Sequence, residues 1–63
     1  MTSYTFEFNF MDTTAPTTTT AYFKTRDDAR AHAQRILDDN SNLSSCILFP
    51  TDDDNDWETL EPS

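Results

Sequence analysis

Aromatic and polar residues alternate strictly near the start of the chain. Between residues 3 and 11, large apolar side chains occupy every second position and polar side chains lie between them. A period of two places the apolar residues on one face of an extended strand. The pattern therefore predicts a half-buried β-strand whose inner face carries Tyr4, Phe6, Phe8 and Phe10.

A second strand is expected after a turn that ends at Pro16. Residues 17–24 begin with four consecutive threonines and include Tyr22 and Phe23, and β-branched and aromatic residues favour strands. The threonine run is also compatible with a solvated segment of low complexity that starts at Pro16. The high β-propensity favours a strand antiparallel to the first.

A helix is predicted to begin after Thr25. Thr25 suits the N-cap, and Asp28 lies three residues later, at the capping-box position. Acidic residues in the first turn also complement the helix dipole. The apolar residues at helical spacing, which form one stripe, are Ala29, Ala33, Ile36 and Leu37. The residues expected on the exposed side are Arg26, Arg30 and Gln34. The helix should end near Asp39 or Asn40.

The remaining residues predict two further strands. Residues 44–49 form an apolar run that Pro50 bounds, residues 51–56 are an acidic turn, and residues 57–60 suit a short strand at a sheet edge. The expected fold class is α+β: a small antiparallel sheet in β-β-α-β-β order with one helix packed on one face. Residues 1–63 would form a single domain.

The expected core is small. It draws on Phe6, Phe8, Phe10, Tyr22 or Phe23, Ala29, Ala33, Ile36, Leu37, Ile47, Phe49 and Trp57. The pattern alone does not decide which parity of the second and third strands faces inward. A domain of this size buries only about 60% of the surface of its unfolded chain. Its stability margin is therefore narrow, and both a monomer and a homodimer remain open.

Charge is distributed very unevenly. The chain has 12 acidic and four basic residues, which gives a net charge of −8. Residues 1–37 contain four of each sign, whereas residues 38–63 contain eight acids and no base. Nucleic acids and anionic membranes are polyanions, so neither is expected as a direct partner. No apolar run approaches the roughly 20 residues that span a bilayer, and residues 1–10 do not resemble a secretory signal.

Composition also limits the possible chemistry. Glycine is absent, which excludes the glycine-dependent phosphate-binding loops and the nucleophile elbow. The single cysteine, Cys46, allows neither an internal disulfide nor a CxxC zinc pattern, and a reducing cytoplasm is the expected compartment. Cys46 lies in an apolar run and His32 beside the helical stripe, so both are expected to be structural residues. We therefore expect a protein that is not an enzyme.

Residues 52–56 match the D-x-D-x-D beginning of an EF-hand loop. The position that requires glycine holds Trp57, and the twelfth position holds Ser63 instead of glutamate. A solvated acidic loop is the favoured interpretation, with a weak calcium site as an alternative. No cofactor or resident metal is expected.

The acidic residues also suggest a recognition surface. Asp38 and Asp39 fall at the negative end of the predicted helix dipole, where each is unfavourable by about 0.3–1 kcal/mol. Local rules that are broken without local gain tend to mark functional surfaces. A basic partner would supply the gain. The expected partner-binding residues are Asp38, Asp39, Asp52, Asp53, Asp54, Asp56, Trp57, Glu58 and Glu61. Trp57 would be the anchor if it is exposed, and otherwise a core or edge-strand residue.

In its length, its β-β-α-β-β order and its acidic cluster, the chain resembles a class of small acidic proteins that bacteriophages and mobile elements encode against host defence. The class includes anti-CRISPR proteins, several of which are DNA mimics. The resemblance implies binding to the positively charged DNA-contacting surface of a CRISPR effector, such as a type I Cascade-like complex, and exclusion of target DNA. It also implies action in the host cytoplasm. The neutral N-terminal half departs from a continuous acidic ridge.

Two other classes fit the same composition. An acidic chain whose only lysine is Lys24 is also typical of a salt-adapted accessory domain. Salt adaptation should spread acids over the whole surface, whereas here they are confined to residues 38–63. An antitoxin-like regulatory subunit that wraps its target is the other alternative.

Overall fold

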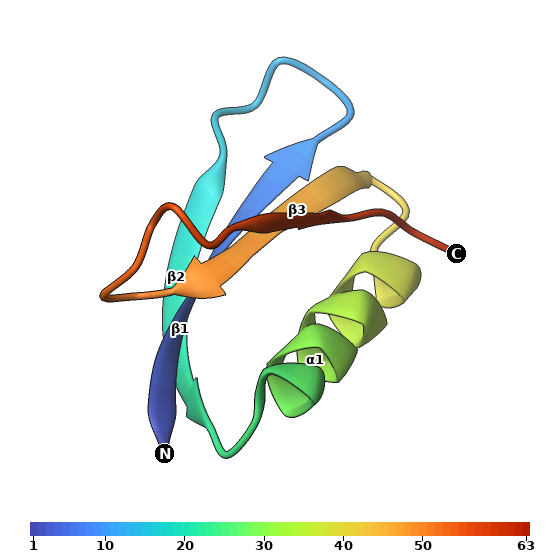
Figure 1. The fold of residues 1–63 in the computed structure, drawn as a ribbon. Coiled ribbons are helices and arrows are strands. Elements are labelled where there is room, and N and C mark those ends of the chain that lie inside the picture. Colours follow the sequence, from blue (N-terminus) through green and yellow to red (C-terminus); the bar gives the residue numbers. More distant parts are fainter.

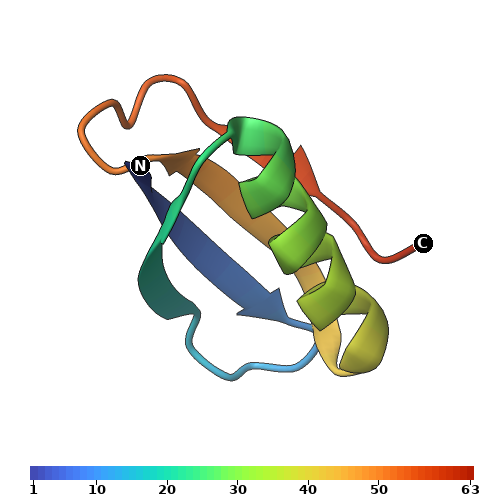
Figure 2. The ribbon, with the colours of Figure 1, turned by 90° about the horizontal axis from the view of Figure 1, so that it is seen from below.

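The computed structural model describes all 63 residues and contains four strands and one helix (Figure 1). The elements are β1 (Thr2–Phe10), β2 (Thr17–Phe23), α1 (Arg26–Asp39), β3 (Leu43–Pro50) and β4 (Glu58–Leu60). The strands form one antiparallel sheet in the order β2-β1-β3-β4. The helix crosses one face of this sheet (Figure 2). The predicted α+β class and β-β-α-β-β order are therefore confirmed.

Strand β1 is one of the two inner strands of the sheet, because it pairs with β2 on one side and β3 on the other. Its alternation has the predicted effect. Tyr4, Phe6 and Phe8 are buried in the core, and Phe10 packs against the core from its margin. Helix α1 therefore packs against the aromatic face of β1.

Helix α1 begins as its sequence predicts. Thr25 has extended backbone angles, and its Oγ1 accepts a hydrogen bond from the backbone N–H of Asp28 at 3.2 Å. Ala29, Ala33 and Leu37 are fully buried against the sheet. Small alanine side chains allow the helix to approach the aromatic face of β1 closely.

The predicted core is wrong for three residues near the C-terminus. Ile47 and Phe49 are only half-buried, and Trp57 is 60% exposed. The core instead takes Cys46 and Leu48, because β3 pairs with β1 so that Leu48 lies opposite Phe6 and shares its face. Both parities of this run are apolar, so the alternation could not select the inner one. In β2, Phe23 packs on the core while Tyr22 is 66% exposed.

The prediction that Arg26, Arg30 and Gln34 lie on an exposed side of α1 is also wrong. All three are half-buried. Their side chains reach toward β4 and the residues that follow it, where they hydrogen bond to acceptors of that segment. Spacing of four residues places them in one row along α1, and the edge strand runs beside that row. The contacts of this row determine which acids remain free.

Candidate functional site: the acidic loop and the edge of the sheet

The loop that joins β3 to β4, residues 51–57, carries four of the eight predicted partner-binding acids. Its first residue is fixed to β1. The backbone N–H of Thr51 donates to the carbonyl oxygen of Ser3 at 2.9 Å. The Thr51 hydroxyl oxygen also lies 2.8 Å from that of Ser3 and 2.9 Å from that of Thr5. These contacts hold the start of the loop in one position on the sheet.

The rest of the loop is built from successive turns. The N–H of Asp53 donates to the carbonyl of Pro50 at 2.9 Å, and the N–H of Asp56 donates to the carbonyl of Asp53 at 3.3 Å. The carboxylate of Asp53 accepts from the N–H of Asn55 at 3.3 Å. Within this frame the three adjacent carboxylates of residues 52–54 are exposed to solvent. The loop thus displays a local concentration of negative charge.

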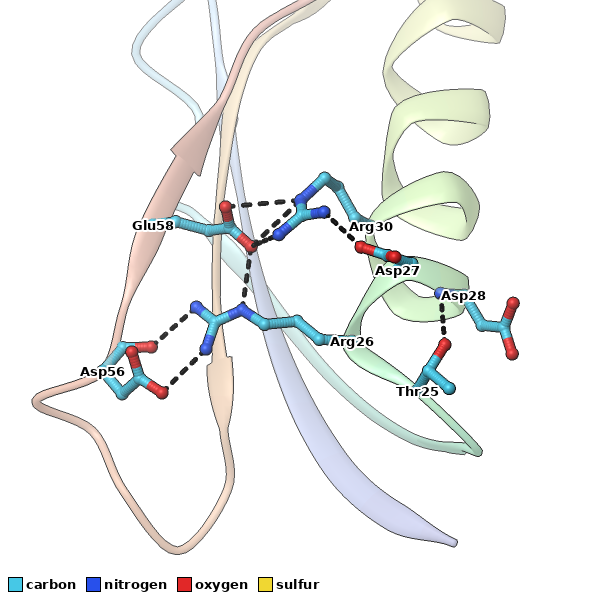
Figure 3. A network of polar contacts seen from close by, with 7 residues as sticks. All are labelled: Thr25, Arg26, Asp27, Asp28, Arg30, Asp56 and Glu58. Atoms are coloured by element: carbon cyan, nitrogen blue, oxygen red, sulfur yellow. Dashed lines mark hydrogen bonds and ion pairs between the residues drawn. The ribbon is translucent and has the colours of Figure 1, made fainter.

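The last acids before and within β4 are paired with arginines of α1 (Figure 3). Arg26 donates from Nη1 to Oδ2 of Asp56 at 2.8 Å and from Nε to Oε1 of Glu58 at 3.0 Å. Arg30 donates from Nη2 to the same Glu58 oxygen at 3.2 Å and from Nη1 to Asp27 at 2.6 Å. Two of the four cations of the chain are therefore used to attach α1 to β4.

The electrostatics of Glu58 follow from this geometry. Partial burial raises the pKa of Glu58, but the hydrogen bonds and charges of Arg26 and Arg30 outweigh it, and the pKa is lowered from its ordinary value. The hydrogen bond with Glu58 is also the main reason why the pKa of Arg26 is raised. Glu58 is therefore ionised and compensated within the fold.

Asp38 has an internal role as well. Its Oδ1 accepts hydrogen bonds from the N–H of Ser63 at 3.0 Å, the hydroxyl of Ser63 at 2.9 Å and the amide of Gln34 at 3.1 Å. The hydrogen bond from the Ser63 backbone is the main reason that the pKa of Asp38 is lowered. These hydrogen bonds thus offset the unfavourable interaction of the Asp38 charge with the helix dipole. Asp39, which is exposed and makes no ion pair, is therefore the acid at this end of α1 whose unfavourable position has no local compensation.

The predicted site residues form two groups, not one continuous surface. One group is on the β3–β4 loop, and the other is at the end of α1 and in the residues after β4, at the opposite end of the molecule (Figure 1). The compensated Glu58 separates them. Apart from Asp38, which Gln34 and Ser63 engage, the predicted site acids that are exposed and make no ion pair are Asp39, Asp52, Asp53, Asp54 and Glu61.

Trp57, the predicted anchor, is placed at the loop end of the sheet. It lines a shallow hollow of about 210 Å³ together with Ile47, Phe49 and Asp54. Sequence reasoning assigned the first two of these partners to the core and so did not associate them with the site. The available signal was the two-residue period of side chains along a strand, which places Ile47 and Phe49 together on the face opposite to Cys46 and Leu48.

Two other side chains with reactive chemistry, Cys46 and His32, lie among residues of the core. Cys46 is fully buried, and this burial raises the pKa of its thiol to about 11, so the nucleophilic thiolate is scarce at neutral pH. His32 is half-buried between the rings of Phe6 and Phe23, with centroid distances of 5.7 and 5.1 Å. No three histidine, cysteine or acidic side chains converge in a way that could hold a metal ion.

Comparisons with known proteins add no family assignment: no family model, no curated protein and no solved structure matches the chain. Helix α1, at 14 residues, is neither long nor apolar enough to cross a membrane.

Proposed function

We propose that this protein is a non-enzymatic acidic inhibitor of the anti-CRISPR type. It binds the positively charged DNA-contacting surface of a CRISPR effector, for which we propose a type I complex, and so prevents the binding of target DNA. It acts in the cytoplasm of the host cell. The observation that carries this proposal is the loop of three adjacent, exposed and uncompensated carboxylates, Asp52, Asp53 and Asp54.

The physical basis is competition between carboxylates and phosphates for the same cations. A concentrated negative field attracts a basic surface over a distance and raises association rates at low salt. Because Thr51 and the turns hold the loop in place, binding requires little further ordering of its backbone, which favours affinity. The loop is the primary contact, and Asp39 and Glu61 form a second one.

The size of the molecule limits how much DNA it can replace. Its longest dimension is 32 Å, and one turn of duplex DNA extends over about 34–36 Å. One copy therefore covers at most about one turn of the DNA-binding path. Inhibition then requires that the protein occupies the part of the effector that contacts DNA first.

A DNA-binding competition tests this proposal. A purified type I effector is mixed with labelled target duplex, and the bound fraction is measured with increasing protein. We expect the protein to displace the DNA, and the Asp52→Asn, Asp53→Asn, Asp54→Asn triple variant to lose this effect. A matched control, Asp12→Asn, Asp27→Asn, Asp28→Asn, has the same net charge of −5 (−8 + 3) but keeps the loop.

The two triple variants separate local recognition from total charge. Circular dichroism first establishes that both are folded. If the control loses inhibition as completely as the loop variant, total charge and not the loop is responsible. If the wild-type protein leaves DNA binding unchanged in every type I effector tested, the proposed function is wrong for this target class.

A further inference from the structure

The face of the sheet opposite α1 is not covered by any element of the chain. Helix α1 lies over the other face (Figure 2). On the uncovered face, Ile47 and Phe49 of β3 are half-buried, and Trp57 is 60% exposed beside them. These three apolar side chains and the exposed Asp54 line the hollow of about 210 Å³. Small-molecule pockets are usually larger, at roughly 300–1,000 Å³, so this hollow suits a single side chain.

The lining of the hollow indicates what kind of side chain fits. Three apolar groups require an apolar stem, whereas the carboxylate of Asp54 and the electron-rich face of an indole both attract a cation. Asp54 makes no ion pair within the chain. Arg26 and Arg30 are paired elsewhere, and Lys24 and Arg35 line a separate hollow beside α1. The cation therefore has to come from another molecule.

Arginine fits this combination better than lysine. Its guanidinium is planar, stacks on aromatic faces, binds a carboxylate with two hydrogen bonds and is more weakly hydrated than an ammonium group. Lysine has a compact, strongly hydrated charge that loses more on leaving water. The surrounding acids attract arginine and lysine side chains equally. The hollow thus gives arginine the higher affinity.

We propose that the hollow formed by Ile47, Phe49, Asp54 and Trp57 receives an arginine side chain of the partner protein. This inference rests on the proposed function, because a DNA-contacting surface is rich in arginine. Asp52 and Asp53 attract the basic surface from a distance, and the hollow then fixes one arginine at short range. Trp57 is the anchor of the interface and Asp54 is its charged partner.

The only tryptophan of the chain is Trp57, so its indole N–H signal in a nitrogen-15 NMR spectrum reports on the hollow alone. The full protein is titrated with two capped peptides, Gly-Arg-Gly-Arg-Gly and Gly-Lys-Gly-Lys-Gly, at constant ionic strength. We expect a saturable shift of the indole signal with the arginine peptide. The lysine peptide should bind about two- to five-fold more weakly, because its ammonium group keeps the attraction to the indole and to Asp54 but lacks planar stacking and the second, parallel hydrogen bond to the carboxylate.

Two variants with equal charge locate the effect. Asp54→Asn should reduce affinity for the arginine peptide several-fold, whereas Asp28→Asn, whose carboxylate is on α1, should change it little. Equal binding of both peptides, or an equal loss in both variants, would overturn the arginine hollow.

Trp57→Leu in the DNA competition separates the two proposals. If this variant inhibits fully while the loop triple variant does not, the hollow is refuted and the acidic inhibitor stands. If neither protein nor variants affect DNA binding, the proposed function fails, whatever the peptides show.

Discussion

Arg26 and Glu58 lie 32 residues apart in the sequence, yet Nε of Arg26 donates a hydrogen bond to Oε1 of Glu58 at 3.0 Å. Arg30 donates to the same carboxylate (Figure 3). Strand β4 has only three residues and pairs on one side alone, so its backbone hydrogen bonds are few. The two guanidinium groups therefore contribute to holding this edge strand against α1.

Removal of the Glu58 charge should destabilise the protein. In Glu58→Gln the side chain keeps its size but has one neutral acceptor oxygen in place of the carboxylate, so the ion pairs with Arg26 and Arg30 are lost. Because the side chains are partly exposed, we expect a loss of about 1 kcal/mol in the free energy of unfolding, measured with urea. Glu61→Gln, an exposed acid without an ion pair, should change it by less than about 0.5 kcal/mol. Equal effects of the two substitutions would contradict the network's role.

The same pair predicts a pH dependence. The pKa of Glu58 is lowered in the folded state from its ordinary value of 4.5. Its stabilising contribution is therefore complete above the ordinary pKa and is lost as the pH falls through the lowered one. Protonation of other acids also relieves repulsion, so the useful quantity is the difference between wild type and Glu58→Gln. We expect this difference to be constant from pH 7 to 6 and to shrink steadily as the pH falls below 4.5 and through the lowered pKa. A difference that does not shrink at all below pH 4.5 would exclude ionised Glu58 as its source.

The elements with a single strong pattern could be predicted from the sequence. The alternation of aromatic and polar residues predicted the inner face of β1. Thr25 as N-cap predicted the start of α1, and the apolar stripe through Ala29 and Ala33 predicted its buried face. The inner face of β3 could not be predicted, because Cys46 and Leu48 are apolar but so are Ile47 and Phe49. Its parity is decided by pairing with β1, a long-range property.

The candidate site was predictable in composition but not in arrangement. The sequence shows eight acids in residues 38–63, but it does not show which of them lie beside cations. Asp56 and Glu58 are compensated only because β4 runs along the row of α1 that carries Arg26 and Arg30. Asp38 is engaged only because Ser63 returns to the end of the helix. Tertiary pairing therefore divides the acids into structural and exposed ones.

The helix cap offers a local test of the fold. Oγ1 of Thr25 accepts the N–H of Asp28, a donor that would otherwise have no partner within the helix. Thr25→Ala should lower the free energy of unfolding by about 1 kcal/mol, whereas Thr25→Ser keeps an acceptor and should cost much less. Urea denaturation of the three proteins measures this. An alanine variant as stable as the serine variant would show that the cap does not contribute.

Two neighbouring residues of β3 test the orientation of the strand. Leu48 is fully buried, whereas Ile47 is half-buried on the opposite face. Leu48→Ala should cost about 2–5 kcal/mol. A 63-residue domain has a total stability of only about 3–9 kcal/mol, so this variant should lose a large part of its stability and, at the lower end of that range, should be unfolded. Ile47→Ala should remain folded, with a loss below half of that value. A reversed order of the two losses would place the opposite face of β3 in the core.

Salt dependence distinguishes a local recognition surface from salt adaptation. The uncompensated acids repel one another, and screening relieves this repulsion. Because the Debye length is already about 8 Å at 0.15 M salt, most of the relief should be complete there. We expect cooperative thermal unfolding at 10 mM KCl, a rise in Tm up to about 0.15 M, and little change beyond it. The Asp52→Asn, Asp53→Asn, Asp54→Asn variant should show a smaller rise, since it has three fewer charges in the loop. A wild-type Tm that continues to climb through 2 M KCl, or a chain that is unfolded at low salt, would favour the salt-adapted alternative over the acidic inhibitor.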